Sequence, residues 1–120
     1  MIKVLIVDDN DYDKTQVIIK LLKEFKEISE NDIIEVKDTS SAKRILKEEK
    51  IDLLILDIKI PINNGDDADP EGGRILLEDI HLDNTLNKPI SIVGISSIDD
   101  SYLKVQSAFN NNLWTLLKFD

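Results

Sequence analysis

The 120-residue chain contains no cysteine, which excludes disulfide bonds and thiolate metal sites and is compatible with a reducing compartment. Aromatic residues make up only 5% of it, and aliphatic residues supply most of the apolar content, as in a sheet of aliphatic strands covered by helices. No apolar run approaches the roughly 18 residues of a membrane span, and the amino terminus lacks a signal-peptide pattern. We therefore expect a cytoplasmic protein without a membrane partner.

Basic residues are in deficit, with 15 Lys and Arg against 24 Asp and Glu, so the net charge is −9. Such a charge disfavours direct binding to nucleic acid or to anionic lipid, although it also serves solubility. The single histidine, His81, is expected on a helix surface and not as a metal ligand, because no second histidine can join it. The length and the 42% apolar content predict one domain over residues 1–120.

Short apolar runs with the length of buried strands recur along the chain, and segments with helical periodicity lie between them. This alternation predicts an α/β fold, in which helices cover both faces of a parallel sheet with right-handed crossovers. The five expected strands are Ile2–Val7, Ile33–Val36, Ile51–Leu56, Ile90–Ile95 and Leu113–Phe119.

Four helices are expected between these strands. The first should reach Ile28, the second should end at the charged run Lys47–Lys50, and the third should use Asp69 as its cap and Pro70 as its first residue. A long acidic loop, Ile62–Gly73, has no periodicity, and loops of that length tend to be functional or mobile. The first helix should begin near Asp11, the second after Thr39 or Ser40 as its N-cap, and the fourth at Ser97. The apolar residues of the first helix are Val17, Ile18, Leu21, Leu22 and Phe25.

Polar residues follow the strands at the edge where parallel sheets bind ligands. The first strand is followed by Asp8 and Asp9, the third by Asp57, the fourth by Ser96 and the fifth ends at Lys118. Taken singly, each has an ordinary explanation as a helix cap, a turn residue or a solvated lysine. Their arrival at the ends of four strands favours an active site.

Three carboxylates at one edge would repel each other by roughly 4 kcal/mol per pair at a separation of about 4 Å, so the site needs a cation or a proton. Oxygen ligands of this kind suit Mg²⁺, which also takes a phosphate oxygen. Asp57 can act as a nucleophile toward phosphorus, Lys118 can neutralise the phosphoryl oxygens, and the Ser96 hydroxyl can donate to one of them.

These residues resemble the receiver domain of bacterial two-component response regulators along almost the whole chain. Lys3–Asn10 is similar to the first strand and acidic pair of that family, and Asp52–Asp57 with Pro61 is similar to its phosphoacceptor strand. The spacing between Ser96 and Lys118 also fits. The resemblance implies a flavodoxin-like, doubly wound sheet of five parallel strands in the order 2-1-3-4-5.

The resemblance further implies phosphorylation of Asp57, with Mg²⁺ held by Asp9, Asp57 and the Lys59 carbonyl, and by Asp8 through water. It implies that Ser96 and Lys118 contact the phosphoryl group. The expected function is a signalling switch and not an enzyme, with at most slow self-dephosphorylation. Its expected partners are a sensor histidine kinase or phosphotransfer protein and a downstream protein.

The chain departs from the receiver pattern in four places. The loop after Pro61 is longer than usual, Thr115 stands where an aromatic residue is normal, and Phe119 replaces the usual proline. The sequence ends at Asp120, where the family continues into a fifth helix. We expect the sheet face so left open to be covered by a second copy in a homodimer or by a helix of another protein, unless the sequence is a shortened piece.

Other functions fit less well. A pseudo-receiver, which would act as a protein-interaction or dimerisation module without phosphorylation, is the main alternative. An aspartate-nucleophile phosphatase would need its paired carboxylates within Asp9–Asp11, leaving Asp57 and Ser96 without roles. A flavin-binding domain would need a neutral phosphate loop, and the run Asp8–Asp11 would repel that phosphate.

Overall fold

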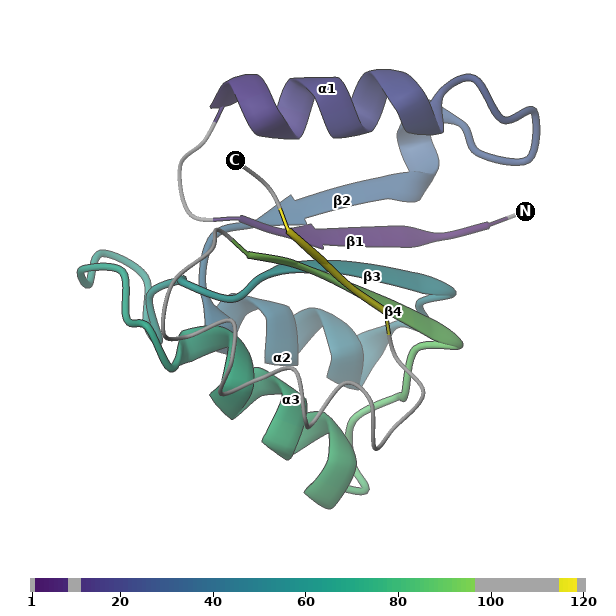
Figure 1. The fold of residues 1–120 in the computed structure, drawn as a ribbon. Helices are drawn as coiled ribbons and strands as arrows, with labels where there is room; N and C mark the ends of the chain where they lie inside the picture. Colours follow the sequence, from purple (N-terminus) through teal and green to yellow (C-terminus); the bar gives the residue numbers. More distant parts are fainter. Residues whose placement is uncertain (1, 9–11, 97–114, 119–120) are drawn as a thin grey trace.

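The computed structural model describes residues 2–8, 12–96 and 115–118 (Figure 1). Strands and helices alternate along these residues, which confirms the expected α/β class. The elements are β1 (Val4–Val7), α1 (Tyr12–Leu22), a short 3₁₀ helix (Glu30–Asp32), β2 (Ile33–Val36), α2 (Thr39–Glu48), β3 (Leu53–Asp57), α3 (Gly72–Leu82), β4 (Ser91–Ser96) and β5 (Thr115–Lys118).

The strands form one parallel sheet in the order β2-β1-β3-β4-β5, which confirms the order that the resemblance to receiver domains implied. The register aligns Val7 of β1 with Leu56 of β3, and Asp57 of β3 with Ile95 of β4. All of these strands therefore end at one edge of the sheet, called here the carboxyl edge, and begin at the opposite, amino edge.

Helices cover both faces of the sheet, with α1 on one face and α2 and α3 side by side on the other (Figure 1). Side chains of a strand alternate between the faces. In β3, Leu54 and Leu56 are fully buried in a core with α2 and α3, while Ile55 joins a second core on the α1 face. The described residues therefore form two cores, one on each face of the sheet.

Helix α1 ends at Leu22, so the expected continuation to Ile28 is wrong. The amides of Glu24, Phe25 and Ile28 each donate to a carbonyl three residues earlier, which tightens the chain into turns. The Ile2 amide then donates to the Glu27 carbonyl oxygen over 3.1 Å, which fixes these turns to the start of β1. As a result Ile28 is buried, but Leu21 and Phe25 are 55% and 58% exposed.

The N-cap of α2 is Asp38, so the prediction that Thr39 or Ser40 caps this helix is wrong. Asp38 Oδ1 accepts a 2.7 Å hydrogen bond from the Ser41 amide, and its Oδ2 accepts one of 2.9 Å from the Ser41 hydroxyl. Asp38 is buried, so its carboxylate is held in the capping position by the surrounding structure.

Helix α3 begins at Gly72, so the prediction that Asp69-Pro70 opens it is wrong. The Asp69 amide donates to the Ile60 carbonyl oxygen over 3.1 Å in an antiparallel bridge, while Asp69 Oδ1 accepts from the Glu71 amide over 2.8 Å. These bonds hold Asp69 in a turn before the helix. The expected fourth helix from Ser97 lies outside the described residues.

The acidic loop between β3 and α3 is closed at its base by the Ile60–Asp69 bridge. It turns at Gly65, whose φ of 90° is in the left-handed region that glycine favours. Asn63 Oδ1 also accepts a 2.6 Å hydrogen bond from the Ser40 hydroxyl at the start of α2.

Within residues 2–8, 12–96 and 115–118, no helix is both long enough and apolar enough to cross a membrane.

Candidate functional site

Two of the predicted acidic residues lie at neighbouring strand ends. Asp57 is the last residue of β3, and Asp8 directly follows β1. Since Val7 pairs with Leu56, the next residue of each strand lies at the same level of the carboxyl edge. The structure therefore brings Asp8 and Asp57 to adjacent positions on the sheet.

The backbones of the other two predicted residues also reach this edge. Ser96 pairs with Lys118 where β4 and β5 end, one residue beyond the pairing of Asp57 with Ile95. The side chains of Ser96 and Lys118 and the whole of Asp9 lie outside what the structure describes. Their contacts with Asp57 therefore stay predictions. His81 lies in the last turn of α3 and is exposed, as expected.

The two described carboxylates have different surroundings. Asp8 is buried, with 9% of its surface exposed, and its amide donates to the Val36 carbonyl oxygen over 3.1 Å. Asp57 is half-buried, and its Oδ1 accepts a 3.1 Å hydrogen bond from the Lys59 amide. Thus Asp57 is partly accessible to solvent, and one of its oxygens is held by the following turn.

Buried residues anchor that turn on both sides of Lys59. Ile58 and Ile60 are 1% and 0% exposed, and the Ile58 amide donates to the Ile95 carbonyl oxygen over 3.2 Å. Lys59 itself is exposed. This alternation of buried and exposed residues holds the Lys59 backbone near Asp57 and leaves the Lys59 side chain in solvent. The role of the Lys59 carbonyl as a metal ligand stays a prediction.

The first residues of α2 and α3 hydrogen-bond to the segment that follows Asp57. The amides of Thr39 and Ser40 donate to the carbonyl oxygens of Pro61 and Ile62, over 3.0 and 2.9 Å. The Gly73 amide donates to the Ile58 carbonyl oxygen over 2.9 Å. The segment is therefore hydrogen-bonded to both α2 and α3. A movement of either helix would displace the backbone next to Asp57.

Gly72 and Gly73 matter here because of close packing, which sequence reasoning missed. A Cβ atom on Gly72 would lie 2.0 Å from the Ile60 carbonyl oxygen, and one on Gly73 would lie 2.7 Å from the Ile58 Cα. The two adjacent glycines let α3 approach the backbone that follows β3.

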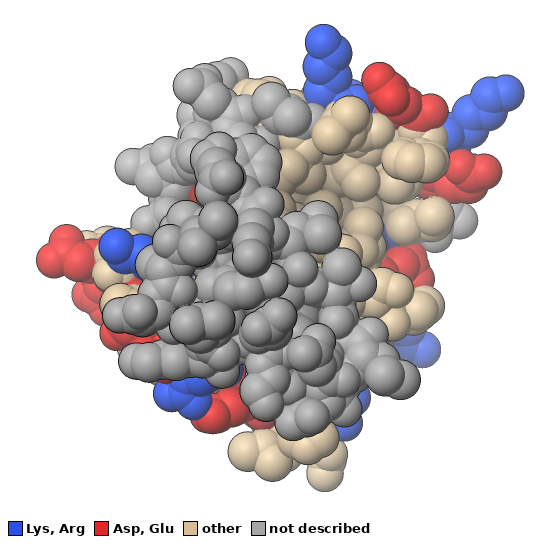
Figure 2. All heavy atoms as spheres, in the orientation of Figure 1, with Lys and Arg blue, Asp and Glu red and all other residues tan. Residues whose placement is uncertain are grey.

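The arrangement fits a divalent cation with oxygen ligands, because Mg²⁺ is commonly held by one or two carboxylates together with water and phosphate oxygens. Asp8 and Asp57 are two such carboxylates. Among the described residues, which omit Asp9, no group of three or more His, Cys, Asp or Glu is placed to hold a metal ion. Figure 2 shows further acidic side chains at the margin where the loop with the exposed Asp66 and Asp67 lies.

Clearly shifted pKa values occur at three residues away from the carboxyl edge or on α3. The hydrogen bond and charge of Glu49 raise the pKa of Lys3, which precedes β1 at the amino edge. A hydrogen bond to Glu71 raises the pKa of Arg74 in α3. Hydrogen bonds from Thr85 lower the pKa of Asp83 at the end of α3. These shifts reflect local ion pairs and caps and not the candidate site.

No known family model matches the chain. In sequence it is 31% identical over 112 residues to the uncharacterized protein y4jS of Sinorhizobium fredii, covering 93% of the chain and 27% of that protein. It is 39% identical over 62 residues to the sensory transduction protein LytR of Streptococcus mutans, covering 52% of the chain and 25% of that protein. The chain thus spans about a quarter of the length of these curated relatives.

In structure the chain is similar to the receiver domain of the Francisella response regulator 1452, with a TM-score of 0.69 and 21% identity over 98% of the chain and 84% of that domain. It is also similar to the receiver domain of sensor histidine kinase PA1611 from Pseudomonas aeruginosa, which holds a magnesium ion in its active site cleft. Here the TM-score is 0.61 and the identity 16%, over 98% of the chain and 86% of that domain. At these identities the likeness establishes the fold.

Proposed function

We propose that this chain, which has the receiver-domain fold of response regulators, is a phosphoacceptor switch of a two-component system that takes a phosphoryl group on Asp57. The observation that carries the proposal is the position of Asp57. It ends the central strand β3 half-exposed, next to the buried Asp8 that follows β1 and one register step from Ser96 on β4.

The reaction follows from these groups. The Asp57 carboxylate attacks the phosphorus of a donor, a new O–P bond forms, and the bond from phosphorus to the leaving group breaks with its electron pair going to that group. Mg²⁺, when bound, neutralises charge on the phosphoryl oxygens, and Asp8, Asp9, Asp57 and the Lys59 carbonyl would hold it. The product is an aspartyl phosphate.

Two further residues would stabilise the product. The Lys118 ammonium would pair with a phosphoryl oxygen, and the Ser96 hydroxyl would donate a hydrogen bond to another. The strand register supports this assignment, because Ser96 and Lys118 pair at the end of neighbouring strands on the Asp57 side. The modification adds a charge of about −1.5 to −2 at the carboxyl edge.

We propose a sensor histidine kinase or a phosphotransfer protein as the donor, and a downstream protein as the recipient of the signal, in the cytoplasm. The net charge of −9 supports protein partners over direct contact with nucleic acid. In this function the chain accepts a group and changes its contacts. It does not act as an enzyme on an external substrate.

Intact mass spectrometry after incubation with acetyl phosphate and Mg²⁺ tests the proposal. The chain should gain the mass of one phosphoryl group, hydroxylamine should release it, and Asp57→Asn should not gain it. Asp66→Asn and Asp67→Asn are matched controls, because both residues are exposed carboxylates in the nearby loop, and they should be modified normally. An adduct that persists in Asp57→Asn would disprove the assignment.

The second candidate function is an interaction module that does not depend on phosphorylation. The observation that favours it is Thr115 at the start of β5, where the receiver pattern has an aromatic residue. Small-angle scattering and sedimentation of the phosphorylated and free chains separate the two functions. The switch predicts a change in shape or assembly, and the module predicts none.

A further inference from the structure

Asn64 and Gly65 lie at the tip of the acidic loop between β3 and α3. The Asp66 amide donates to the Asn63 carbonyl oxygen over 3.1 Å, so Asn64 and Gly65 are the two central residues of a tight turn. Both are exposed, and the φ of Gly65 is 90°. The turn therefore presents to solvent an asparagine side chain and, directly after it, the backbone nitrogen of a glycine.

An asparagine side chain can react with the backbone nitrogen that follows it, which makes asparagine one of the thermolabile residues. Here the Gly65 nitrogen would attack Asn64 Cγ. A bond forms between these two atoms, the bond from Cγ to Nδ2 breaks, and the proton of the Gly65 amide, carried by solvent, leaves with Nδ2 as ammonia. Water then opens the succinimide ring, to aspartate at the side-chain carbonyl or to isoaspartate at the backbone carbonyl.

The surroundings of Gly65 leave its nitrogen free for this attack. A Cβ atom added to Gly65 would meet no heavy atom within 4 Å, so no neighbouring group blocks the closing of the ring. Glycine itself has no Cβ to crowd the reacting atoms. Within the part of the chain that the structure describes, no hydrogen bond engages the Gly65 amide. The reacting groups are adjacent in the chain, which favours an intramolecular reaction.

Two other exposed asparagines, Asn31 and Asn84, lack this freedom. The backbone nitrogen after Asn31 donates to the Ser29 carbonyl oxygen over 3.0 Å. The backbone nitrogen after Asn84 donates to Asp83 Oδ1 over 2.9 Å. In both places the nitrogen that would have to attack is already hydrogen-bonded and belongs to a residue with a side chain.

Two further asparagines are held by their side chains. Asn87 Nδ2 donates to the Glu49 carbonyl oxygen over 3.1 Å, and Asn63 Oδ1 accepts from the Ser40 hydroxyl over 2.6 Å. Asn64 is also the one asparagine in the sequence that a glycine follows. The sequence and the structure therefore single out the same asparagine.

We propose that Asn64 is a site of spontaneous deamidation, at which the exposed turn converts it through a succinimide into isoaspartate and aspartate. The reaction requires no enzyme and no phosphoryl group, so the inference is independent of the proposed function. Either product adds a carboxylate beside the exposed Asp66 and Asp67. Isoaspartate also lengthens the backbone of the turn, which disturbs the hydrogen bond between Asp66 and Asn63. The modification would mark the age of the chain.

Peptide mapping of the aged chain tests the proposal. The folded chain is incubated at neutral pH and physiological temperature, and the tryptic peptide Ile60–Arg74 is then fragmented by electron transfer, which distinguishes isoaspartate from aspartate. Both products should accumulate with time at residue 64, while Asn31, Asn84 and Asn87 of the same sample remain amides. A sample digested without ageing gives the background from digestion.

Variants of the turn identify the attacking group. Gly65→Ala should lower the rate of product formation at residue 64 about tenfold or more, because a Cβ atom crowds the attacking nitrogen. Asn64→Gln should remove the product at this position. Asn84→Gln is the matched control, since it changes another exposed asparagine, and it should leave the rate at residue 64 unchanged.

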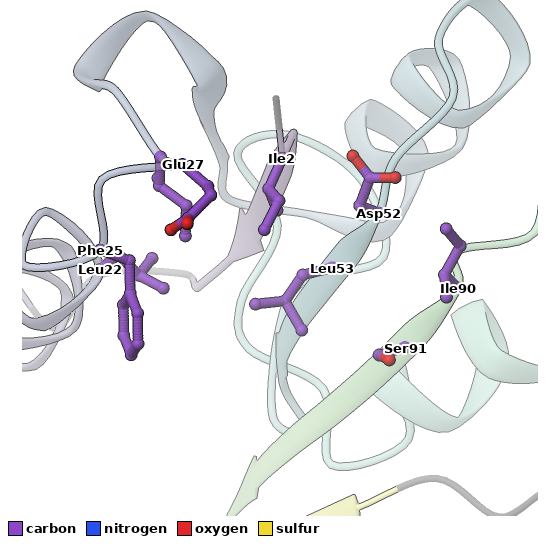
Figure 3. Close-up of a pocket in the computed structure, with 9 residues that line it drawn as sticks. Ile2, Leu22, Phe25, Glu27, Asp52, Leu53, Ile90 and Ser91 are labelled. Carbon is purple, nitrogen blue, oxygen red and sulfur yellow. The ribbon is translucent and has the colours of Figure 1, made fainter.

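NMR spectra of the aged chain report the consequence for the loop. The amide signals of Asp66 and Asp67 should each split into a parent set and a product set, and the product set should grow at the rate found by peptide mapping. Leu53 and Ser91 line a hollow at the amino edge, at the other end of the strands (Figure 3), and their signals should stay unchanged.

The inference is overturned if Asn64 stays intact in the folded chain under conditions in which the urea-unfolded chain loses it. Product at Asn84 in equal amount would also overturn it, because the selection by the turn would then be absent. A rate in Gly65→Ala equal to that of the parent chain would exclude the Gly65 nitrogen as the attacking group.

Discussion

The hydroxyl of Thr39 donates a hydrogen bond of 2.9 Å to the carbonyl oxygen of Gly72, and both residues are buried. This bond joins the first residue of α2 to the first residue of α3. The Thr39 amide meanwhile donates to Pro61 in the segment that follows Asp57. Thr39 thus links both helices of this face to the segment that follows Asp57.

Thr39→Val should lower the free energy of unfolding by about 1–3 kcal/mol, because it leaves the buried Gly72 carbonyl oxygen without its donor. Urea denaturation followed by circular dichroism measures the change. Thr39→Ser keeps the hydroxyl and should retain part of the stability. Ser40→Ala, which removes an exposed hydrogen bond to Asn63, should change it by no more than about 0.5 kcal/mol. Equal losses in Thr39→Val and Ser40→Ala would contradict the role of the buried bond.

Gly72→Ala should destabilise the chain by at least about 3 kcal/mol, because its methyl group would overlap the Ile60 carbonyl oxygen. Since that backbone follows Asp57, phosphorylation by acetyl phosphate should also slow. Gly65→Ala is the matched control, since its Cβ would meet no atom within 4 Å. It should cost only about 1 kcal/mol through its positive φ. Comparable melting temperatures for the two variants would refute the packing explanation.

Asp38→Ala should lower stability by about 0.5–2 kcal/mol through loss of the α2 cap. Asp38→Asn keeps an oxygen acceptor and should lose less. Thermal unfolding by calorimetry gives both values. If Asp38→Ala were harmless while Ser40→Ala unfolded the helix, the cap would belong to Ser40 after all.

Thr85→Val should raise the pKa of Asp83 toward its ordinary value, because the Thr85 hydroxyl donates a 2.6 Å hydrogen bond to the carboxylate. The Thr85 amide bond of 2.9 Å remains, so part of the lowering should persist. NMR titration of the Asp83 carboxyl carbon measures the shift, and Thr85→Ser should leave it in place.

The same pair sets a pH dependence. The pKa of Asp83 is lowered in the folded chain, so its contribution to stability is complete above the ordinary pKa of the carboxyl group. It declines as the pH falls through the lowered value. The stability difference between the parent chain and Thr85→Val should therefore shrink on acidification. A difference that grows below pH of about 4 would contradict this assignment.

The parts of the fold that depend on local pattern could be predicted from the sequence. The apolar run before Asp57 has the length of a buried strand, and the alternation of strands and helices leads to the observed parallel sheet. Because parallel strands end at one edge, the neighbouring positions of Asp8 and Asp57 followed from the same pattern.

The parts that depend on distant contacts could not be predicted. Asp38, Thr39 and Ser40 are all good N-cap residues, and the choice follows from the use of the Thr39 hydroxyl by Gly72. The start of α3 depends on the bridge between Asp69 and Ile60. The end of α1 has no glycine or proline as a stop signal.

The position of β3 inside the sheet has a consequence for its hydrogen exchange. β3 is bonded to β1 on one side and β4 on the other, and Leu54 and Leu56 are fully buried, whereas β2 lies at the edge with half-buried residues. The amide protons of β3 should therefore exchange with deuterated water only when the whole molecule opens, and those of β2 earlier. A new charge on Asp57 would act on a rigid base, and the displacement that it causes would fall on the residues that follow the strand.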